Sequence, residues 1–121
     1  VKLISVVPSV DTGVCSLQTQ RFNNEAGKIG NVQVITVSMD LPFAQKRWVE
    51  ENKVDKLDIL SDHRDADFGE KYGVLIKELR LLARSIFVVD SNDKLTYKEV
   101  VSEVGNHPDY DKALEAAGQA E

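Results

Sequence analysis

Dense runs of aliphatic and β-branched residues recur along the chain, separated by polar segments, and each predicts a buried strand. The run VQVITVSM is the clearest, because nearly all of its residues are apolar or β-branched. Strands of this kind usually lie in the middle of a sheet that is covered on both faces. The predicted strands span residues 1–7, 32–39, 57–60, 84–89 and 95–101.

Between these runs, apolar residues at helical spacing and local start signals predict four helices. Turn-forming residues at 8–13 precede the first helix, and Pro108 and Asp109 precede the last. Asp40 is placed to cap the second helix, which begins at Pro42. The predicted helices span residues 14–26, 42–52, 65–72 and 110–117.

The resulting order of elements is β-α-β-α-β-α-β-β-α. Strands that alternate with helices predict parallel pairing, and the short polar linker at residues 90–94 predicts an antiparallel hairpin at the sheet edge. We therefore expect an α/β, thioredoxin-like fold: a central mixed, mostly parallel sheet flanked by helices. No internal repeat or linker divides the sequence, so residues 1–121 are expected to form a single domain.

Composition narrows the possible functions. The net charge of -5 argues against a nucleic-acid-binding surface. No apolar run approaches the roughly 20 residues that span a bilayer, so no membrane partner is expected. A single cysteine excludes an internal disulfide and a CxxC redox pair. The chain enters an apolar run directly at Val1 without a signal-peptide pattern, which favours a cytoplasmic protein and suggests that an N-terminal segment is missing.

Cys15 has two interpretations. A lone cysteine is most often a small buried hydrophobe. This one, however, falls in the first turn of a predicted helix that follows a strand and a capping loop. Unpaired backbone N–H groups and the helix dipole favour an anion there, and α/β folds place ligands at this end of a strand. Position therefore favours a reactive thiolate.

Two residues in the loop that precedes Cys15, Pro8 and Thr12, strengthen this interpretation. Thr12 is either a helix cap or a hydroxyl that hydrogen-bonds both the thiolate and a substrate oxygen. Pro8 stiffens the loop through its fixed φ and would shield the thiolate from water. Each signal is weak alone, but the spacing Pro8-x-x-x-Thr12-x-x-Cys15 is specific.

The segment PSVDTGVC resembles the active-site motif of the peroxiredoxins, and more closely that of the bacterial thiol peroxidase subfamily. The resemblance extends over essentially the whole chain. It continues in SMDLPFAQKRW, DHRDADFGEKYGV, LLARSIFVVD and PDYDKALEA. It implies a thioredoxin-like enzyme that reduces hydroperoxides, with alkyl hydroperoxides preferred, and that forms homodimers.

The resemblance also implies site residues. Cys15 corresponds to the peroxidatic cysteine, Thr12 and Pro8 to its motif partners, and Arg84 to the arginine that completes the site. The thiolate attacks a peroxide oxygen and becomes a sulfenic acid, while donors stabilise the charge on the leaving oxygen. This chemistry requires no metal and no organic cofactor. Arg80, close in sequence to Arg84, is not selected by the motif.

One position departs from the family pattern. Thiol peroxidases typically carry a resolving cysteine where this chain has Val49. The sulfenic acid would then be resolved by an external thiol or by thioredoxin. Three explanations stay open: a natural one-cysteine peroxidase, an engineered cysteine replacement, or a protein that has lost peroxidase turnover.

The alternative function is a non-catalytic thioredoxin-fold module or a redox sensor. The four site residues together argue against it, because such a module needs neither Thr12 nor Arg84 at these positions. His63 and His107 lie far apart in sequence and are interpreted as surface residues, so no metal site is expected. Three apolar residues are assigned equally to the core or to a collar or subunit contact: Leu41, Phe43 and Trp48.

Overall fold

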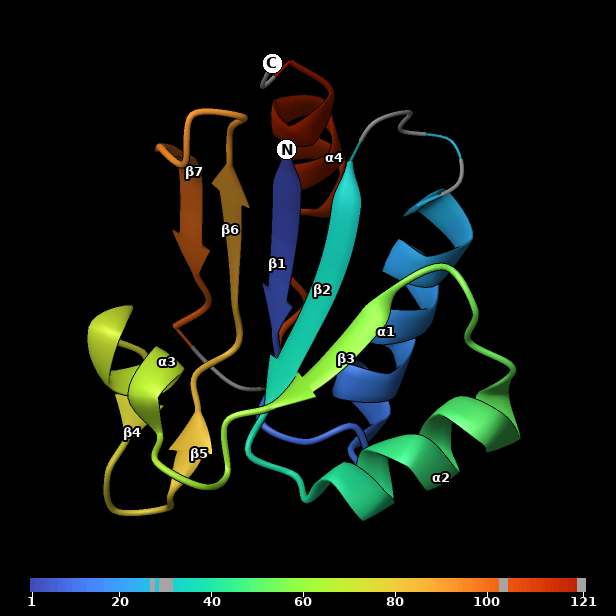
Figure 1. Cartoon of the computed structure of the whole chain (residues 1–121), viewed down its shortest axis with the longest axis vertical. Coiled ribbons are helices and arrows are strands. Elements are labelled where there is room, and N and C mark those ends of the chain that lie inside the picture. The colour runs from blue at the N-terminus through green and yellow to red at the C-terminus, as the bar shows by residue number, and fades with distance from the viewer. Residues whose placement is uncertain (27, 29–31, 103–104, 120–121) are drawn as a thin grey trace.

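The computed structural model describes residues 1–26, 28, 32–102 and 105–119. Within them, five strands form one mixed sheet in the order β3-β2-β1-β6-β7 (Figure 1). The pairs β1–β2 and β2–β3 are parallel, whereas β1–β6 and β6–β7 are antiparallel. The strand bounds are β1 Lys2–Val6, β2 Gln33–Ser38, β3 Asp58–Ser61, β6 Ser85–Val89 and β7 Leu95–Val100. The expected α/β, thioredoxin-like fold is confirmed.

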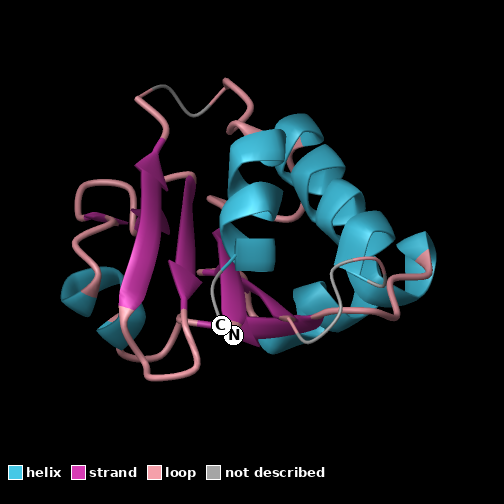
Figure 2. Ribbon diagram, turned by 90° about the horizontal axis from the view of Figure 1, so that it is seen from above, coloured by secondary structure: helices cyan, strands magenta, loops and turns pink. Residues whose placement is uncertain are grey.

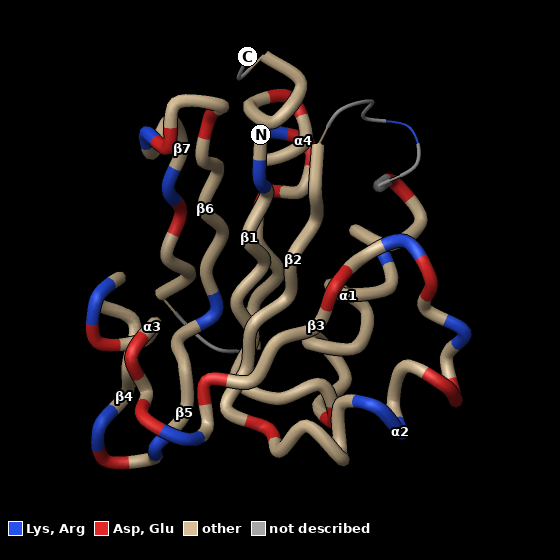
Figure 3. The backbone as a smooth tube through the Cα atoms, viewed as in Figure 1, with Lys and Arg blue, Asp and Glu red and all other residues tan. Residues whose placement is uncertain are grey.

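Charge and burial explain the order of the strands. Strands β2 and β6 contain no charged residue, and all five residues of β6 are buried (Figure 3). Strand β7 alternates exposed and half-buried positions, as a strand at a sheet edge does. The apolar strands therefore occupy the middle of the sheet, where both faces are covered.

Helices cover the sheet unequally (Figures 1 and 2). The helices are α1 Gly13–Ala26, α2 Pro42–Asn52, α3 Asp67–Lys71 and α4 Tyr110–Gln119. On one face, Phe22 of α1 and Ala113 of α4 pack against Leu3 and Val34 of the sheet. On the other face, the sheet packs against the region around α3. None of the described helices is long and apolar enough to cross a membrane.

The predicted elements are all present, and one pair of strands was not predicted. Strands β4 Leu75–Ile76 and β5 Leu81–Leu82 form a small antiparallel hairpin. Two residues are too few to produce a periodic pattern. The prediction of a mostly parallel sheet is wrong, because two of the four strand pairings that the structure describes in it are antiparallel. Antiparallel pairing is not confined to the predicted edge hairpin, since β6 pairs with β1 as well as with β7.

The start of one helix and the cap of another differ from the prediction. Helix α3 begins after Ala66, whose φ of 51° interrupts helical geometry, rather than at residue 65. The capping residue of α2 is Leu41, which makes no side-chain cap hydrogen bond, so the predicted capping role of Asp40 is wrong. The carboxylate of Asp40 instead accepts hydrogen bonds from Ser9 and Val10, which belong to the loop that precedes α1.

Candidate active site

The start of α1 fixes the position of Cys15. The backbone N–H of Cys15 donates to the Thr12 hydroxyl oxygen at 3.3 Å, and that of Ser16 donates to the Thr12 carbonyl at 2.9 Å. Thr12 is therefore the N-terminal cap, and Cys15 lies in the first helical turn as predicted. The cysteine is free and fully buried. Burial alone fits both interpretations of this residue.

The residue that distinguishes them is Arg84. It lies between β5 and β6, is only 2% exposed, and donates from Nη2 to Cys15 Sγ at 3.0 Å. The two residues are 69 positions apart in sequence. A buried guanidinium at hydrogen-bond distance stabilises negative charge on sulfur, whereas an inert buried thiol does not require such a partner. The structure thus brings together the two residues that the resemblance paired.

Gln18, a residue without a role in the sequence prediction, fixes the orientation of Arg84. Arg84 Nη1 donates to Gln18 Oε1 at 2.9 Å, and Gln18 Nε2 donates to the Ser5 hydroxyl at 2.7 Å. All three side chains are buried. Gln18 follows Cys15 by three residues, so both lie on the same side of α1. The three-residue spacing from Cys15 was the signal in the sequence, but any ordinary residue of the helix one turn further along has the same spacing.

A cavity of about 410 Å³ lies beside the cysteine and the arginine. Arg84, Thr12 and Pro8 line it, together with apolar residues of α1 and of the β4–β5 hairpin region. The apolar lining residues are Val14, Ile76, Leu79 and Leu81. Three of the four predicted site residues therefore line one cavity, and the fourth, Cys15, accepts a hydrogen bond from one of them, Arg84.

The Thr12 hydroxyl makes two contacts in this structure. It accepts from the Cys15 N–H and donates to the Ser9 carbonyl at 3.3 Å. The capping role expected for Thr12 is thus present. Its second expected role, a hydrogen bond to a substrate oxygen, requires the hydroxyl to exchange the Ser9 carbonyl for that oxygen.

Val49, where the resemblance implies a resolving cysteine, also lies near the site. Cys15 belongs to a buried apolar cluster with Val7, Val10, Trp48 and Val54. Against this cluster packs the partly buried side chain of Val49 from α2.

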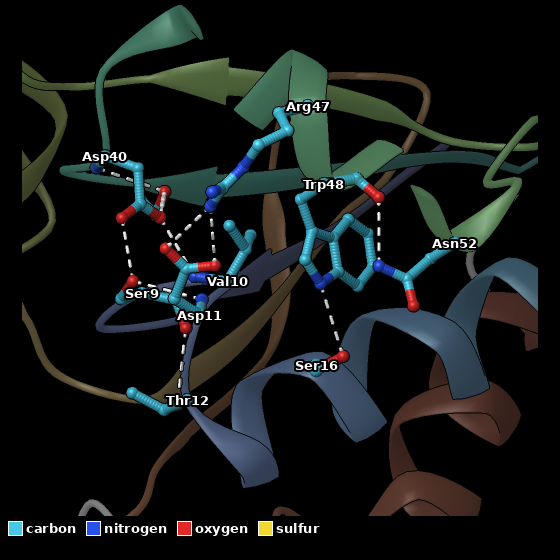
Figure 4. Close-up of polar contacts among 10 residues, drawn as sticks. Ser9, Val10, Asp11, Thr12, Ser16, Asp40, Arg47, Trp48 and Asn52 are labelled. Atoms are coloured by element: carbon cyan, nitrogen blue, oxygen red, sulfur yellow. Dashed lines mark hydrogen bonds and ion pairs between the residues drawn. The ribbon is translucent and has the colours of Figure 1, made fainter. Parts of the chain in front are cut away.

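Of the three apolar residues near α2, only Trp48 is core. It is 4% exposed, and its indole N–H donates to Ser16 Oγ at 3.3 Å (Figure 4). Phe43 is 83% exposed and Leu41 is 47% exposed. The core interpretation is therefore wrong for these two residues.

The ionisation of the Tyr110 phenol, in α4, is influenced by its burial and by charges of the site. Burial raises the pKa of the Tyr110 phenol, an effect that the positive charges of Arg84 and Arg21 partly oppose. The phenol oxygen lies 2.7 Å from His107 Nδ1. Tyr110 is thus uncharged at neutral pH. Among the described residues, no group of three or more His, Cys, Asp or Glu side chains is placed to hold a metal ion.

Together these features define a class: a thioredoxin-like α/β protein whose single cysteine, at the start of the first helix, faces a buried arginine. The comparisons with known proteins agree with this class. The Redoxin family matches residues 1–114. A peroxiredoxin-like protein from Aquifex aeolicus superposes with a TM-score of 0.93 at 39% identity, over 99% of this chain and 71% of that one.

More specific relatives are thiol peroxidases. The one from Oceanobacillus iheyensis is 68% identical over 114 residues, which are 94% of this chain and 70% of the relative. The one from Bacillus subtilis is 63% identical over 117 residues, covering 97% of this chain and 70% of the relative. The chain belongs to the Redoxin family and, within it, to the thiol peroxidase subfamily.

Proposed function

We propose that this chain reduces hydroperoxides with Cys15 as the attacking nucleophile and a thiol as the electron donor. The observation that carries the proposal is the 3.0 Å contact between Arg84 Nη2 and Cys15 Sγ in a buried site. The thiolate is the nucleophilic form of cysteine, and the adjacent guanidinium stabilises it. The names of the relatives, which are thiol peroxidases, support the same activity.

The first step consumes the peroxide. The thiolate attacks one peroxide oxygen, an S–O bond forms, and the O–O bond breaks. The electron pair of that bond leaves on the second oxygen, which takes up a proton to become an alcohol, or water when the substrate is hydrogen peroxide. The sulfur is oxidised to a sulfenic acid and the peroxide is reduced.

Hydrogen-bond donors already in place assist this step. Charge develops on the leaving oxygen, and donors that need no rearrangement stabilise it most effectively. We assign this role to the guanidinium of Arg84, to the Thr12 hydroxyl and to the backbone N–H groups at the start of α1. Pro8, at the edge of the same cavity, limits the access of water to the sulfur.

The apolar lining of the cavity favours organic hydroperoxides. We expect reduced protein, mixed with one equivalent of cumene hydroperoxide, to form a sulfenic acid at Cys15 within milliseconds to seconds. Hydrogen peroxide should react more slowly, because it buries no apolar surface against Val14, Leu79 and Leu81. Rapid-quench mass spectrometry with a sulfenic-acid trap measures both rates.

The same experiment tests the alternative function. A non-catalytic module has a Cys15 that reacts with cumene hydroperoxide no faster than free cysteine, whereas a redox sensor forms the sulfenic acid but does not continue to consume peroxide when excess thiol is present. A rate equal to that of free cysteine, in a folded sample, would therefore exclude the peroxidase.

The second half of the cycle requires thiols from outside the chain, because the sequence contains one cysteine. A first thiol condenses with the sulfenic acid, releasing water and forming a mixed disulfide. A second thiol then displaces Cys15 and restores its reduced form. Thioredoxin or a low-molecular-weight thiol can serve as this reductant.

The assignment of Val49 to the resolving position has its own test. In a Val49→Cys variant, peroxide treatment is expected to produce an intramolecular disulfide with Cys15, because position 49 packs against the cluster that contains Cys15. Non-reducing mass spectrometry of tryptic peptides detects the bond. The matched control is Glu50→Cys, at the neighbouring exposed position of α2. A disulfide in both variants, or in neither, would contradict the assignment.

A further inference from the structure

The carboxylate of Asp40 is the centre of a hydrogen-bond network next to the site (Figure 4). Its Oδ1 accepts from the Ser9 hydroxyl at 2.7 Å. Its Oδ2 accepts from the Val10 N–H at 2.9 Å and from the Ser38 hydroxyl at 2.7 Å. Asp40 follows β2, whereas Ser9 and Val10 belong to the loop before α1. One carboxylate thus connects two segments about 30 residues apart.

On the loop side, the network continues to Cys15. The Ser9 hydroxyl oxygen accepts from the Asp11 N–H at 3.1 Å. The Ser9 carbonyl accepts from the Thr12 hydroxyl at 3.3 Å, and the oxygen of that hydroxyl accepts from the Cys15 N–H. Only Ser9 and Thr12 separate the Asp40 carboxylate from the backbone of the cysteine.

On the other side, the network is attached to the rigid core. The Ser38 hydroxyl oxygen accepts from Gln45 Nε2 at 2.9 Å, and the same nitrogen donates to the Leu60 carbonyl at 2.9 Å. Gln45 is 4% exposed. The Ser61 hydroxyl donates to the Asp40 carbonyl at 2.5 Å. Asp40 is therefore fixed to β2, α2 and β3.

A second connection, the ion pair of Arg47 with Asp11, is weaker. Arg47 Nη2 lies 3.2 Å from both Asp11 carboxylate oxygens. However, both side chains are more than half exposed, so water and salt screen the attraction. The partly buried hydrogen bonds of Asp40 are the stronger constraint on the loop.

We propose that Asp40 is a positioning residue for the reaction of Cys15 with peroxides: it holds the loop of residues 8–12 so that Thr12 and the start of α1 are in place before the substrate binds. This inference rests on the proposed function. A negative charge near the sulfur would by itself disfavour the thiolate, so a direct electrostatic effect of Asp40 has the opposite sign. A carboxylate is suited to the role because its two oxygens accept from three donors at once.

The test compares Asp40→Ala and Asp40→Asn with the unmodified chain. In Asp40→Ala, the rate constant with cumene hydroperoxide is expected to fall by about 10- to 100-fold, because small misplacements of reacting groups carry costs of this size. The rate with iodoacetamide should fall by less than about 3-fold or rise, because this reagent needs an accessible thiolate but no aligned donors. Asp40→Asn keeps one acceptor oxygen and should recover most of the peroxide rate.

Controls separate positioning from general damage. Asp65→Asn, an exposed residue in the loop before α3, should match the unmodified chain in both reactions. If Asp40→Ala does not fold, Ser9→Ala decides, and an unchanged peroxide rate in Ser9→Ala then overturns the role of Asp40. Ser9→Ala removes one of the three donors to Asp40 and should lower the peroxide rate by about 3- to 10-fold, a smaller loss than that expected for Asp40→Ala.

The outcomes are distinct. An unchanged or faster peroxide rate in Asp40→Ala, with the unmodified chain reactive, overturns the role of Asp40 and leaves the peroxidase intact. Equal losses with peroxide and iodoacetamide, not recovered in Asp40→Asn, indicate general damage and also overturn it. An unmodified chain that reacts like free cysteine overturns the proposed function and this inference together.

Discussion

Replacing Cys15 with serine is expected to abolish the reaction with hydroperoxides. Cys15 is the chain's one cysteine, so no other thiol can take over the attack on the peroxide oxygen. A serine hydroxyl stays protonated at neutral pH and is a far weaker nucleophile than a thiolate. Peroxide consumption, measured with cumene hydroperoxide and excess thiol, should fall to the rate without protein.

Serine nearly matches cysteine in size, so the fold should persist in this variant. The free energy of unfolding and the circular dichroism spectrum serve as the control. Peroxide consumption above background by a folded Cys15→Ser variant would mean that another group performs the chemistry. In that case Cys15 would have only the buried structural role considered from the sequence.

Replacing Arg84 has the second largest expected effect. In Arg84→Met, the rate constant of Cys15 with cumene hydroperoxide should fall by about 10²- to 10³-fold, the usual cost of losing one donor that stabilises developing oxygen charge. The rate constant of Arg84→Lys should lie between those of Arg84→Met and the unmodified chain. A lysine ammonium keeps the charge but lacks the planar guanidinium that donates to Cys15 and Gln18 together. Stopped-flow fluorescence of Trp48, in the same cluster as Cys15, offers a readout.

Arg80→Met is the matched control for Arg84. Arg80 lies four residues earlier and is exposed, so its replacement removes the same charge from the chain without touching the sulfur. We expect its peroxide rate to stay within about 3-fold of the unmodified chain, since exposed charges at this distance are screened. Equal losses in the two variants would show that net charge, rather than the contact at Cys15, controls the rate.

Much of the fold could be predicted from the sequence. The helix that begins beside Cys15 was recognised from the turn residues before it and from Thr12 three positions upstream. Helix α2 was predicted with its observed bounds, because Pro42 marks a helix start. The β4–β5 hairpin was missed, since its two-residue strands carry no pattern of their own.

The candidate site was only partly predictable. Cys15, Thr12 and Pro8 are close in sequence, and their spacing alone was informative. Arg84 was selected only by resemblance to a family, because its partner Cys15 lies 69 positions away in sequence. Gln18 was placed on the helix but received no role, since its partners come from β1 and from the segment before β6.

The sequence by itself determined the order of the elements apart from the β4–β5 hairpin, and the location of the cysteine at a helix start. Both depend on local properties: the periodicity of apolar residues and the capping of backbone N–H groups. The tertiary structure alone decided which distant partners meet. It placed Arg84 in contact with Cys15. It also directed the Asp40 carboxylate to Ser9 and Val10 instead of to the start of α2. A charged side chain pairs with whichever donors or acceptors the packed sheet brings within reach, and sequence spacing does not encode that choice.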